Sequence, residues 1–187
     1  MKTARPFKPI PFRQVQQGFT LVEMVVAMGL LAVIVAFAAP SFADMARRQR
    51  VEAFKDSVIG AIQLARTEAI RLGEPVVLRR IQPCPEASSN SEWRCGWRMF
   101  ADANDNQIHD EDETLLQNVQ TPAGVVLRKA GAVNTGAVAI DRFGQVTQAG
   151  TRLEIYPEGQ GLSAADGMLI CFPAGSRVRT LKGATKC

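Results

Sequence analysis

The chain has 187 residues, of which 47% are hydrophobic and 21% are charged, and its formal net charge is +4. This size suits one globular domain with an appendage, and the hydrophobic fraction excludes a chain that is disordered throughout. Four bases precede Gly18, and the other 18 of the 22 Lys and Arg residues match the 18 Asp and Glu residues in number. The composition therefore gives no general reason to expect a polyanionic partner, so any such argument must rest on local charge.

An apolar stretch follows the basic leader. Between Phe19 and Ala39 only Thr20 and Glu23 are distinctly polar. At the helical rise of about 1.5 Å per residue, this stretch spans about 30 Å, the thickness of the hydrocarbon core of a bilayer. We therefore predict a transmembrane helix with a cytoplasmic N-terminus, as the positive-inside rule requires. A secretory signal would be cleaved behind the apolar stretch, whereas the better break here lies in front of it.

The helical pattern resumes beyond Pro40 and acquires a polar face. From Val51 to Leu72 apolar residues recur at spacings of three and four, and Arg and Lys occupy the opposite face. Gly73, followed by an acid and a proline, predicts the end of the helix. The sequence thus predicts one continuous or gently kinked helix that begins at about Phe19. Its apolar stripe consists of Val51, Phe54, Val58, Ile62, Ala65, Ala69 and Leu72.

Beyond this helix the period shifts toward two, and short β-prone runs alternate with turns rich in Gly, Asn, Asp and Pro. No second long helix intervenes, so we expect an antiparallel sheet packed on the helix stripe, an α+β fold. The predicted strands lie in VVLRRI, WRCGWRMF, TLLQNV, GVVLRK, AVAIDRFG, RLEIY, GMLICF and RVRTL. The predicted segments are a leader of residues 1–18, a transmembrane helix of residues 19–42, its amphipathic continuation over residues 43–74 and a β-sheet domain of residues 75–187.

The four cysteines argue against zinc. Ten residues separate Cys84 from Cys95 and fifteen separate Cys171 from Cys187, with no CxxC pair and no nearby histidine ligand. Two disulfides, Cys84 to Cys95 and Cys171 to Cys187, fit better. Four cysteines allow three connectivities, and sequence proximity alone favours this one. Such bonds imply an oxidising compartment, the periplasm or beyond.

The acidic segment DANDNQIHDEDE allows two interpretations. Its oxygen-bearing side chains match positions 1, 3, 5, 9 and 12 of the EF-hand spacing, with the Ile108 carbonyl at position 7. Gln107 replaces the usual glycine at position 6, and β-prone runs flank the loop where an EF-hand has helices. The favoured interpretation is an Asx-rich hairpin turn that stays solvated without an ion. We therefore expect no cofactor; in the calcium interpretation the ligands are Asp102, Asn104, Asn106, Asp110 and Glu113.

The sequence gives little support for a platform that stacks bases or for an enzyme active site. Trp93, Trp97 and Phe100 fit the alternation of a half-buried strand, so core or sheet packing is favoured over a platform for stacking bases. The single histidine, His109, lies in the acidic turn, and the sequence has neither a GxSxG motif nor a phosphate-binding glycine loop. We therefore predict no enzyme activity.

The stretch GFTLVE, from Gly18 to Glu23, resembles the prepilin peptidase motif of type IV pilins and type II secretion pseudopilins. LARTEAIRLGEPVVL, GWRMFADANDNQIHDEDETLL and GSRVR look like the FimT/FimU and GspH group of minor pilins, so the resemblance covers nearly all of residues 18–187. It implies a type IV pilin-like fold, cleavage between Gly18 and Phe19 by prepilin peptidase, and N-methylation of the Phe19 amine.

The resemblance also implies a structural role. The subunit would sit in the inner membrane as a single-pass protein with its C-terminal domain in the periplasm. It would then join other minor and major pilins at the tip or initiation complex of a pilus. A GspH-like pseudopilin of a type II secretion system is the rival identity, and Pro40, the paired cysteines and the basic tail favour the pilus. A monomeric membrane-anchored binding protein is a further alternative, which predicts no processing.

Glu23 is a carboxylate in the apolar stretch. An ionised carboxylate deep in a bilayer costs roughly 2.5–3.5 kcal/mol on insertion scales, so it requires a partner. The resemblance implies that this partner is the charged Phe19 amine of a neighbouring subunit in a filament. The alternative is a generic anchor in which Glu23 reaches the lipid headgroups.

The C-terminal tail is basic and has no acid. In RVRTL the alternation of a strand places Arg177 and Arg179 on one face, about 6 to 7 Å apart, a spacing that suits neighbouring phosphates of DNA. In FimT-like minor pilins of transformable bacteria, a GRxR tail is associated with DNA binding during uptake. Here GSRVR matches the two arginines, but Ser176 separates them from the glycine. The alternative is a solvated edge strand. The DNA-binding candidates are Arg177, Arg179, Lys182 and Lys186.

Overall fold

The computed structural model describes residues 18–131, 136–148, 150–173 and 177–187, without the side chains of residues 38–40. Except for Gly18, the predicted leader lies outside the described residues, and so does Ser176 of the tail motif. The chain forms two compact units, Met1–Phe42 and Ala43–Cys187.

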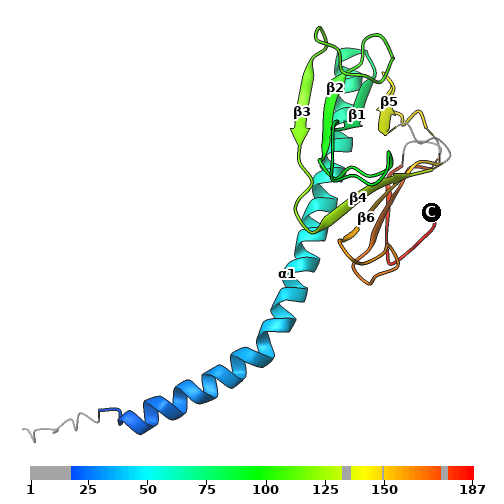
Figure 1. The fold of residues 1–187 in the computed structure, drawn as a ribbon. Coiled ribbons are helices and arrows are strands. Elements are labelled where there is room, and N and C mark those ends of the chain that lie inside the picture. The colour runs from blue at the N-terminus through cyan, green and yellow to red at the C-terminus, as the bar shows by residue number, and fades with distance from the viewer. Residues whose placement is uncertain (1–17, 132–135, 149, 174–176) are drawn as a thin grey trace, which may run out of the picture. The chain divides into compact units, whose positions relative to one another are not determined.

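The long helix, α1, spans Leu21–Leu72 and begins two residues later than predicted (Figure 1). Thr20 stands immediately before it, and its Oγ1 accepts a hydrogen bond of 3.2 Å from the backbone N–H of Glu23. This is the N-cap geometry that satisfies one of the free N–H groups of a first turn. At the other end Gly73 has a φ of 72° and donates its N–H to the carbonyl of Ala69 at 2.9 Å. The predicted left-handed cap is thus confirmed.

A membrane span requires a sufficiently long and apolar helix. Among the described residues, no single helix meets this requirement alone. The stretches Leu21–Phe37 and Ser41–Leu72 meet it as a bent pair, on length and composition only.

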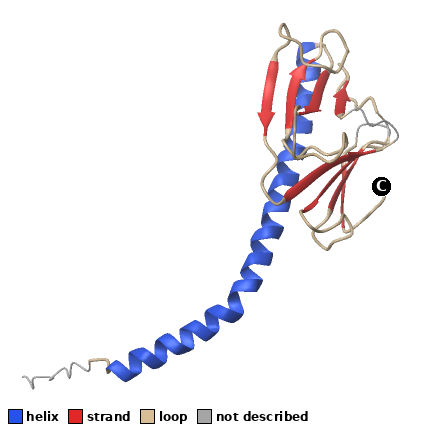
Figure 2. Ribbon diagram, in the orientation of Figure 1, coloured by secondary structure: helices blue, strands red, loops and turns tan. Residues whose placement is uncertain are grey.

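Eight strands follow within the described residues, each overlapping one of the predicted runs, and every pairing between them is antiparallel. They form two four-stranded sheets (Figure 2): sheet A in the order β3-β2-β1-β5 and sheet B in the order β4-β6-β7-β8. The prediction of an antiparallel architecture is confirmed, but its division into two sheets was not predicted. The bounds are β1 Val76–Arg80, β2 Trp97–Ala101, β3 Leu115–Val119, β4 Val125–Ala130, β5 Ala137–Ile140, β6 Arg152–Pro157, β7 Met168–Cys171 and β8 Arg179–Lys182.

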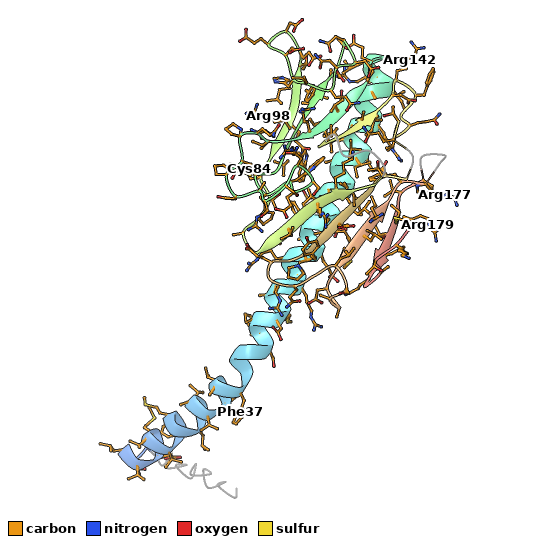
Figure 3. All side chains as sticks on the ribbon, turned by 45° about the vertical axis from the view of Figure 1, so that its right-hand side comes forward. Phe37, Cys84, Arg98, Arg142, Arg177 and Arg179 are labelled. Atoms are coloured by element: carbon orange, nitrogen blue, oxygen red, sulfur yellow. A yellow bond between two sulfur atoms is a disulfide. The ribbon has the colours of Figure 1, made fainter. Side chains whose placement is uncertain are left out.

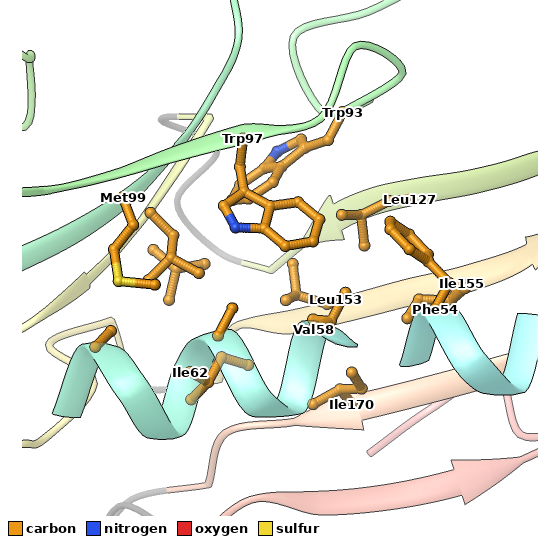
Figure 4. Close-up of a cluster of buried hydrophobic side chains, with 14 of the residues drawn as sticks. Phe54, Val58, Ile62, Trp93, Trp97, Met99, Leu127, Leu153, Ile155 and Ile170 are labelled. Atoms are coloured by element: carbon orange, nitrogen blue, oxygen red, sulfur yellow. The ribbon is translucent and has the colours of Figure 1, made fainter. Parts of the chain in front are cut away.

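Both sheets pack on the predicted stripe of α1 (Figure 4). Phe54, Val58 and Ile62 are 4%, 2% and 0% exposed, and only Leu72 of the predicted stripe is half-buried. Trp97 of sheet A lies against Phe54, with ring centroids 5.7 Å apart. Sheet B contributes the inward rows of β4, β6 and β7 to the same cluster. The predicted core role of Trp93 and Trp97 is confirmed, since each is 1% exposed.

A second, smaller cluster lies on the outer face of sheet A. It consists of Val77, Phe100, Ala137 and Ala139, which alternate along β1, β2 and β5 with the residues that face α1. The β2–β3 register shifts between Met99 and Phe100. The imidazole of His109 packs edge-on against the Phe100 ring, with centroids 5.1 Å apart. The acidic loop that follows β2 therefore folds back over the outer face of its own sheet.

Both predicted disulfides are present. Cys84 bonds to Cys95 in the segment between β1 and β2, and Cys171 at the end of β7 bonds to Cys187 at the C-terminus. No cysteine among the described residues is free. The second bond fixes the chain end beyond β8 to the body of sheet B, as the sequence predicted.

Candidate functional site

The residues of the predicted processing and assembly site lie at the start of α1. Gly18 and Phe19 precede the helix, and Phe19 is 79% exposed. Glu23 lies in the first helical turn and is also exposed. The peptide bond at which the sequence predicts cleavage is thus exposed, and Phe19 lies four residues ahead of Glu23.

Thr20 is a residue that the sequence reasoning missed. With Glu23 it forms the pattern of a capping box, Thr-x-x-Glu ahead of an apolar run. The sequence carried this signal in TLVE, and the hydrogen bond from the Glu23 N–H to Thr20 Oγ1 shows half of the box in place. Glu23 therefore has a local role as well, because a carboxylate in a first turn interacts favourably with the helix dipole.

The first turns of α1 expose their apolar side chains. Each large apolar residue from Leu21 to Phe37 is exposed, by between 49% for Met24 and 80% for Leu21. A contiguous apolar surface of this kind is not stable in water alone and requires a cover, either lipid or other apolar helices.

The arginines of the C-terminal tail are exposed on one side of the domain (Figure 3). β8 begins at Arg179, so Arg177 precedes the strand and the alternation predicted for RVRTL does not apply to it. This corrects the predicted strand boundary by two residues. β8 pairs with β7 and forms an edge of sheet B.

The other two tail bases are placed differently. Lys182 is three positions from Arg179 in β8, so the two side chains project to opposite faces of the sheet. Its Nζ lies 3.2 Å from the Glu52 carboxylate of α1, a pair exposed to solvent on both sides. Lys186 is exposed beyond the strand. All four bases of the tail are thus exposed, but Lys182 projects to the face of the sheet opposite to Arg179.

The acidic loop is organised by hydrogen bonds between its own groups. Asp102 is 0% exposed, and its carboxylate accepts the backbone N–H groups of Asn106 at 3.0 Å and Gln107 at 2.9 Å. Burial raises the pKa of Asp102, while these two bonds oppose the shift. The side-chain amides of Asn104 and Asn106 both donate to Asp110 Oδ2 at 2.8 Å and lower the pKa of that carboxyl.

These contacts bear on the calcium prediction. Gln107 has a φ of 60°, so it adopts the conformation for which an EF-hand uses glycine at position 6. Glu113 accepts the Asp110 N–H at 3.1 Å, however, and among the described residues no three His, Cys, Asp or Glu side chains gather as a metal-holding group. The loop oxygens serve as acceptors for the turn, which favours the Asx-turn interpretation, and calcium binding stays a prediction.

Comparison with known proteins agrees with this arrangement. The family model described as "Type II transport protein GspH" matches residues 56–182, and the "Prokaryotic N-terminal methylation motif" matches residues 13–39. No curated protein sequence matches the chain significantly.

Two solved structures have the same fold. The minor pseudopilin EpsH from the type 2 secretion system of Vibrio cholerae is 16% identical, with 71% of this chain and 97% of that chain covered and a TM-score of 0.50. The type IV minor pilin FimU of Pseudomonas aeruginosa is 12% identical, with 75% and 96% covered and a TM-score of 0.54. These likenesses confirm the pilin-like α+β fold. Because the GspH match covers most of the chain and the methylation motif precedes it, the chain belongs to the GspH family of minor pilins and pseudopilins.

Proposed function

We propose that this protein is a minor type IV pilin, a structural subunit that helps to initiate or cap a pilus. The observation that carries the proposal is the N-terminal methylation motif over residues 13–39, which runs into the first half of α1, where the large apolar side chains are exposed. Before assembly the subunit would be anchored in the inner membrane with its β-sheet domain in the periplasm. Prepilin peptidase would cut after Gly18, and other pilins would then cover the apolar surface of α1.

In this proposal Glu23 holds a neighbouring subunit in register. Its carboxylate would pair with the Phe19 amine of that subunit, in an apolar setting where an unpaired charge is costly. The capping contact with Thr20 matters for the design of the test, because a substitution at Glu23 can also weaken the first turn. Glu23→Gln removes the charge but keeps an oxygen acceptor at the capping-box position, so it isolates the ion pair from the cap.

The test uses the protein from its host. Mass spectrometry is expected to find methylated Phe19 at the N-terminus, and Glu23→Gln is expected to be processed normally but to enter sheared fibres at a fraction of the wild-type level. Thr20→Ala is the matched variant, because it weakens the cap and leaves the charge. An intact Met1 would refute processing. Equal incorporation of the Glu23→Gln variant would remove the role of the ion pair.

The second candidate is a GspH-like pseudopilin of a type II secretion system. It is favoured by the family match over residues 56–182 and by the likeness to EpsH. Deleting the gene separates the two candidates. A pilin predicts loss of surface pili with normal secretion of exoproteins, and a pseudopilin predicts the reverse.

DNA binding through the tail is an added role that we propose for the pilus case. It is supported by Arg177 and Arg179, which are both exposed and lie beside an end of the chain that a disulfide holds in place. Two phosphate contacts would produce weak binding with a log–log salt slope of about −2. The purified full chain is expected to retard duplex DNA at low salt, and the Arg177→Ala, Arg179→Ala double variant to lose this shift. Arg142→Ala changes an arginine in another part of the domain and is the control (Figure 3). A shift that the double variant retains would contradict the role.

A further inference from the structure

We propose that Arg79, Arg98 and His109 form a binding site for a single oxyanion, a phosphate or carboxylate group, on the outer face of sheet A. All three residues line a cleft of about 220 Å³. We call it the arginine cleft. In Figure 3 Arg98 lies on the opposite side of the domain from Arg177 and Arg179, so the cleft is separate from the C-terminal tail.

The sheet register places the two arginines side by side. Arg79 of β1 is the cross-strand partner of Arg98 of β2. Both alternate with residues of the α1-facing core, and they therefore share the outer face with Val77 and Phe100. Like charges directly opposite each other destabilise a sheet. Over the described part of the chain neither arginine forms an ion pair with a carboxylate, so an external anion is the partner that would relieve this repulsion.

The two guanidinium groups retain free donors. Arg79 donates one Nη1–H to the Gln107 carbonyl at 2.5 Å, which fixes its orientation and leaves its other N–H groups available. Arg98 is exposed, and its guanidinium group has no hydrogen-bond or ion-pair partner among the described residues. A pair of planar forks of this kind suits an oxyanion, which accepts several N–H bonds at once.

Neighbouring groups add to the positive character of the cleft. Arg80, which also lines it, donates to Asn90 Oδ1 at 2.7 Å. Burial and, to a lesser extent, the charge of Arg79 lower the pKa of Arg80. His109, which also lines the cleft, packs edge-on against Phe100, and its Nε2 is buried without a partner among the described groups. A buried polar nitrogen with no partner costs free energy, which a polar occupant would reduce.

The dimensions of the cleft limit the occupant. A volume of about 220 Å³ is below that of sites for drug-sized ligands but accommodates one phosphate or carboxylate group. The loop that carries His109 also carries Asp105, Asp110, Glu111 and Asp112, whose repulsion grows with the charge of the ligand and therefore disfavours a polyanion more than a single anionic group. The occupant is therefore a single anionic group, either a free small anion or a carboxylate side chain presented by another protein.

The test is an NMR titration of the full chain in detergent, in which the side-chain Nε–Hε signals of the arginines are followed. The probes are inorganic phosphate and acetate, with chloride at matched ionic strength as the reference. We expect saturable shifts of the Arg79 and Arg98 signals with both probes. Arg98→Gln removes one fork without breaking a contact in the fold, and it is expected to weaken binding about tenfold or more. Arg142→Gln is the matched control and is expected to bind as the wild type does.

Comparing the binding of phosphate and acetate distinguishes a free phosphate group from a protein carboxylate as the occupant of the cleft. Tighter binding of phosphate indicates a free phosphate group, and binding of acetate that equals or exceeds it indicates a protein carboxylate. The proposal is overturned if the shifts follow ionic strength alone, or if Arg98→Gln binds as tightly as Arg142→Gln. A short oligonucleotide that occupies the cleft more tightly than phosphate would contradict the single-group occupant.

Discussion

Gly96 stands where the Cys84–Cys95 segment enters β2, and we predict that Gly96→Ala is severely destabilising. Its φ is 93°, and a Cβ at this position would lie 1.9 Å from the carbonyl oxygen of Val119 and 2.7 Å from the Cα of Gln120. These are backbone atoms of β3 and the residue after it, and they cannot rotate away as a flexible side chain could. The overlap can be relieved only if β3 moves away from β2.

The magnitude has two parts. The left-handed backbone costs a residue with a Cβ about 1–2 kcal/mol. Displacing β3 weakens the pairing of Trp97 with Val119 and the hydrogen bonds beside it, each worth about 1 kcal/mol, and it also disturbs the packing below. The expected loss is therefore about 3–5 kcal/mol, a large part of the free energy of unfolding of a typical domain.

The assay is urea unfolding of the full chain in detergent, followed by tryptophan fluorescence. Trp93 and Trp97 are each 1% exposed, so their emission reports loss of the core directly. Gly159→Ala is the matched control, because Gly159 has a φ of 77° but nothing lies within 4 Å of a Cβ there. The control should lose only the backbone part, about 1–2 kcal/mol. Equal losses in the two variants would refute the steric argument.

Three further predictions concern two buried residues and one disulfide bond. Burial lowers the pKa of Lys129 to about 8, so between about pH 8 and 10 the unfolded chain binds more protons than the folded one and the free energy of unfolding rises with pH. In urea titrations at several pH values, Lys129→Met should abolish this increase of the unfolding free energy with pH. If the increase persists in the variant, another group causes it. Replacing Cys84 and Cys95 with serine removes a cross-link with a sequence separation of 11, so the free energy of unfolding should fall by about 2–3 kcal/mol. The loss is measured as a lower melting temperature, and an unchanged melting temperature would contradict it. Leu127→Ala at a fully buried position of β4 should cost about 2–5 kcal/mol in the same urea assay, and a loss below about 1 kcal/mol would mean that the core closes around the cavity.

The helix and the strands could be predicted because their signals are local. The spacing of Val51, Phe54 and Val58 identifies the buried side of α1, and Gly73 marks its end. The division into two sheets could not be predicted, because strands of both sheets show the same alternation. Nothing local distinguishes β5, which returns to pair with β1, from β6, which pairs with β4.

The candidate sites were predictable to different degrees. Gly18, Phe19 and Glu23 follow from a contiguous motif, and the family match agrees with it. The arginine cleft was missed because Arg79 and Arg98 are neighbours only through the β1–β2 register. Phe100 was correctly expected to be buried, at 0% exposure, but the alternation along β2 places it with Arg98 on the outer face, where the folded acidic loop and His109 cover it.

The connection that carries β5 back to β1 has a consequence for biosynthesis. Val76 pairs with Ile140, and Ile62 of α1 shares one buried cluster with Ile170 of β7, so the fold joins distant parts of the chain. A chain that emerges from the ribosome at about 5–20 residues per second leaves the inner side of its helix bare for roughly 5–20 s before the last covering strand appears. Contacts this distant in sequence also close slowly. The apolar stripe of α1 therefore stays uncovered during most of the synthesis of the strands that bury it.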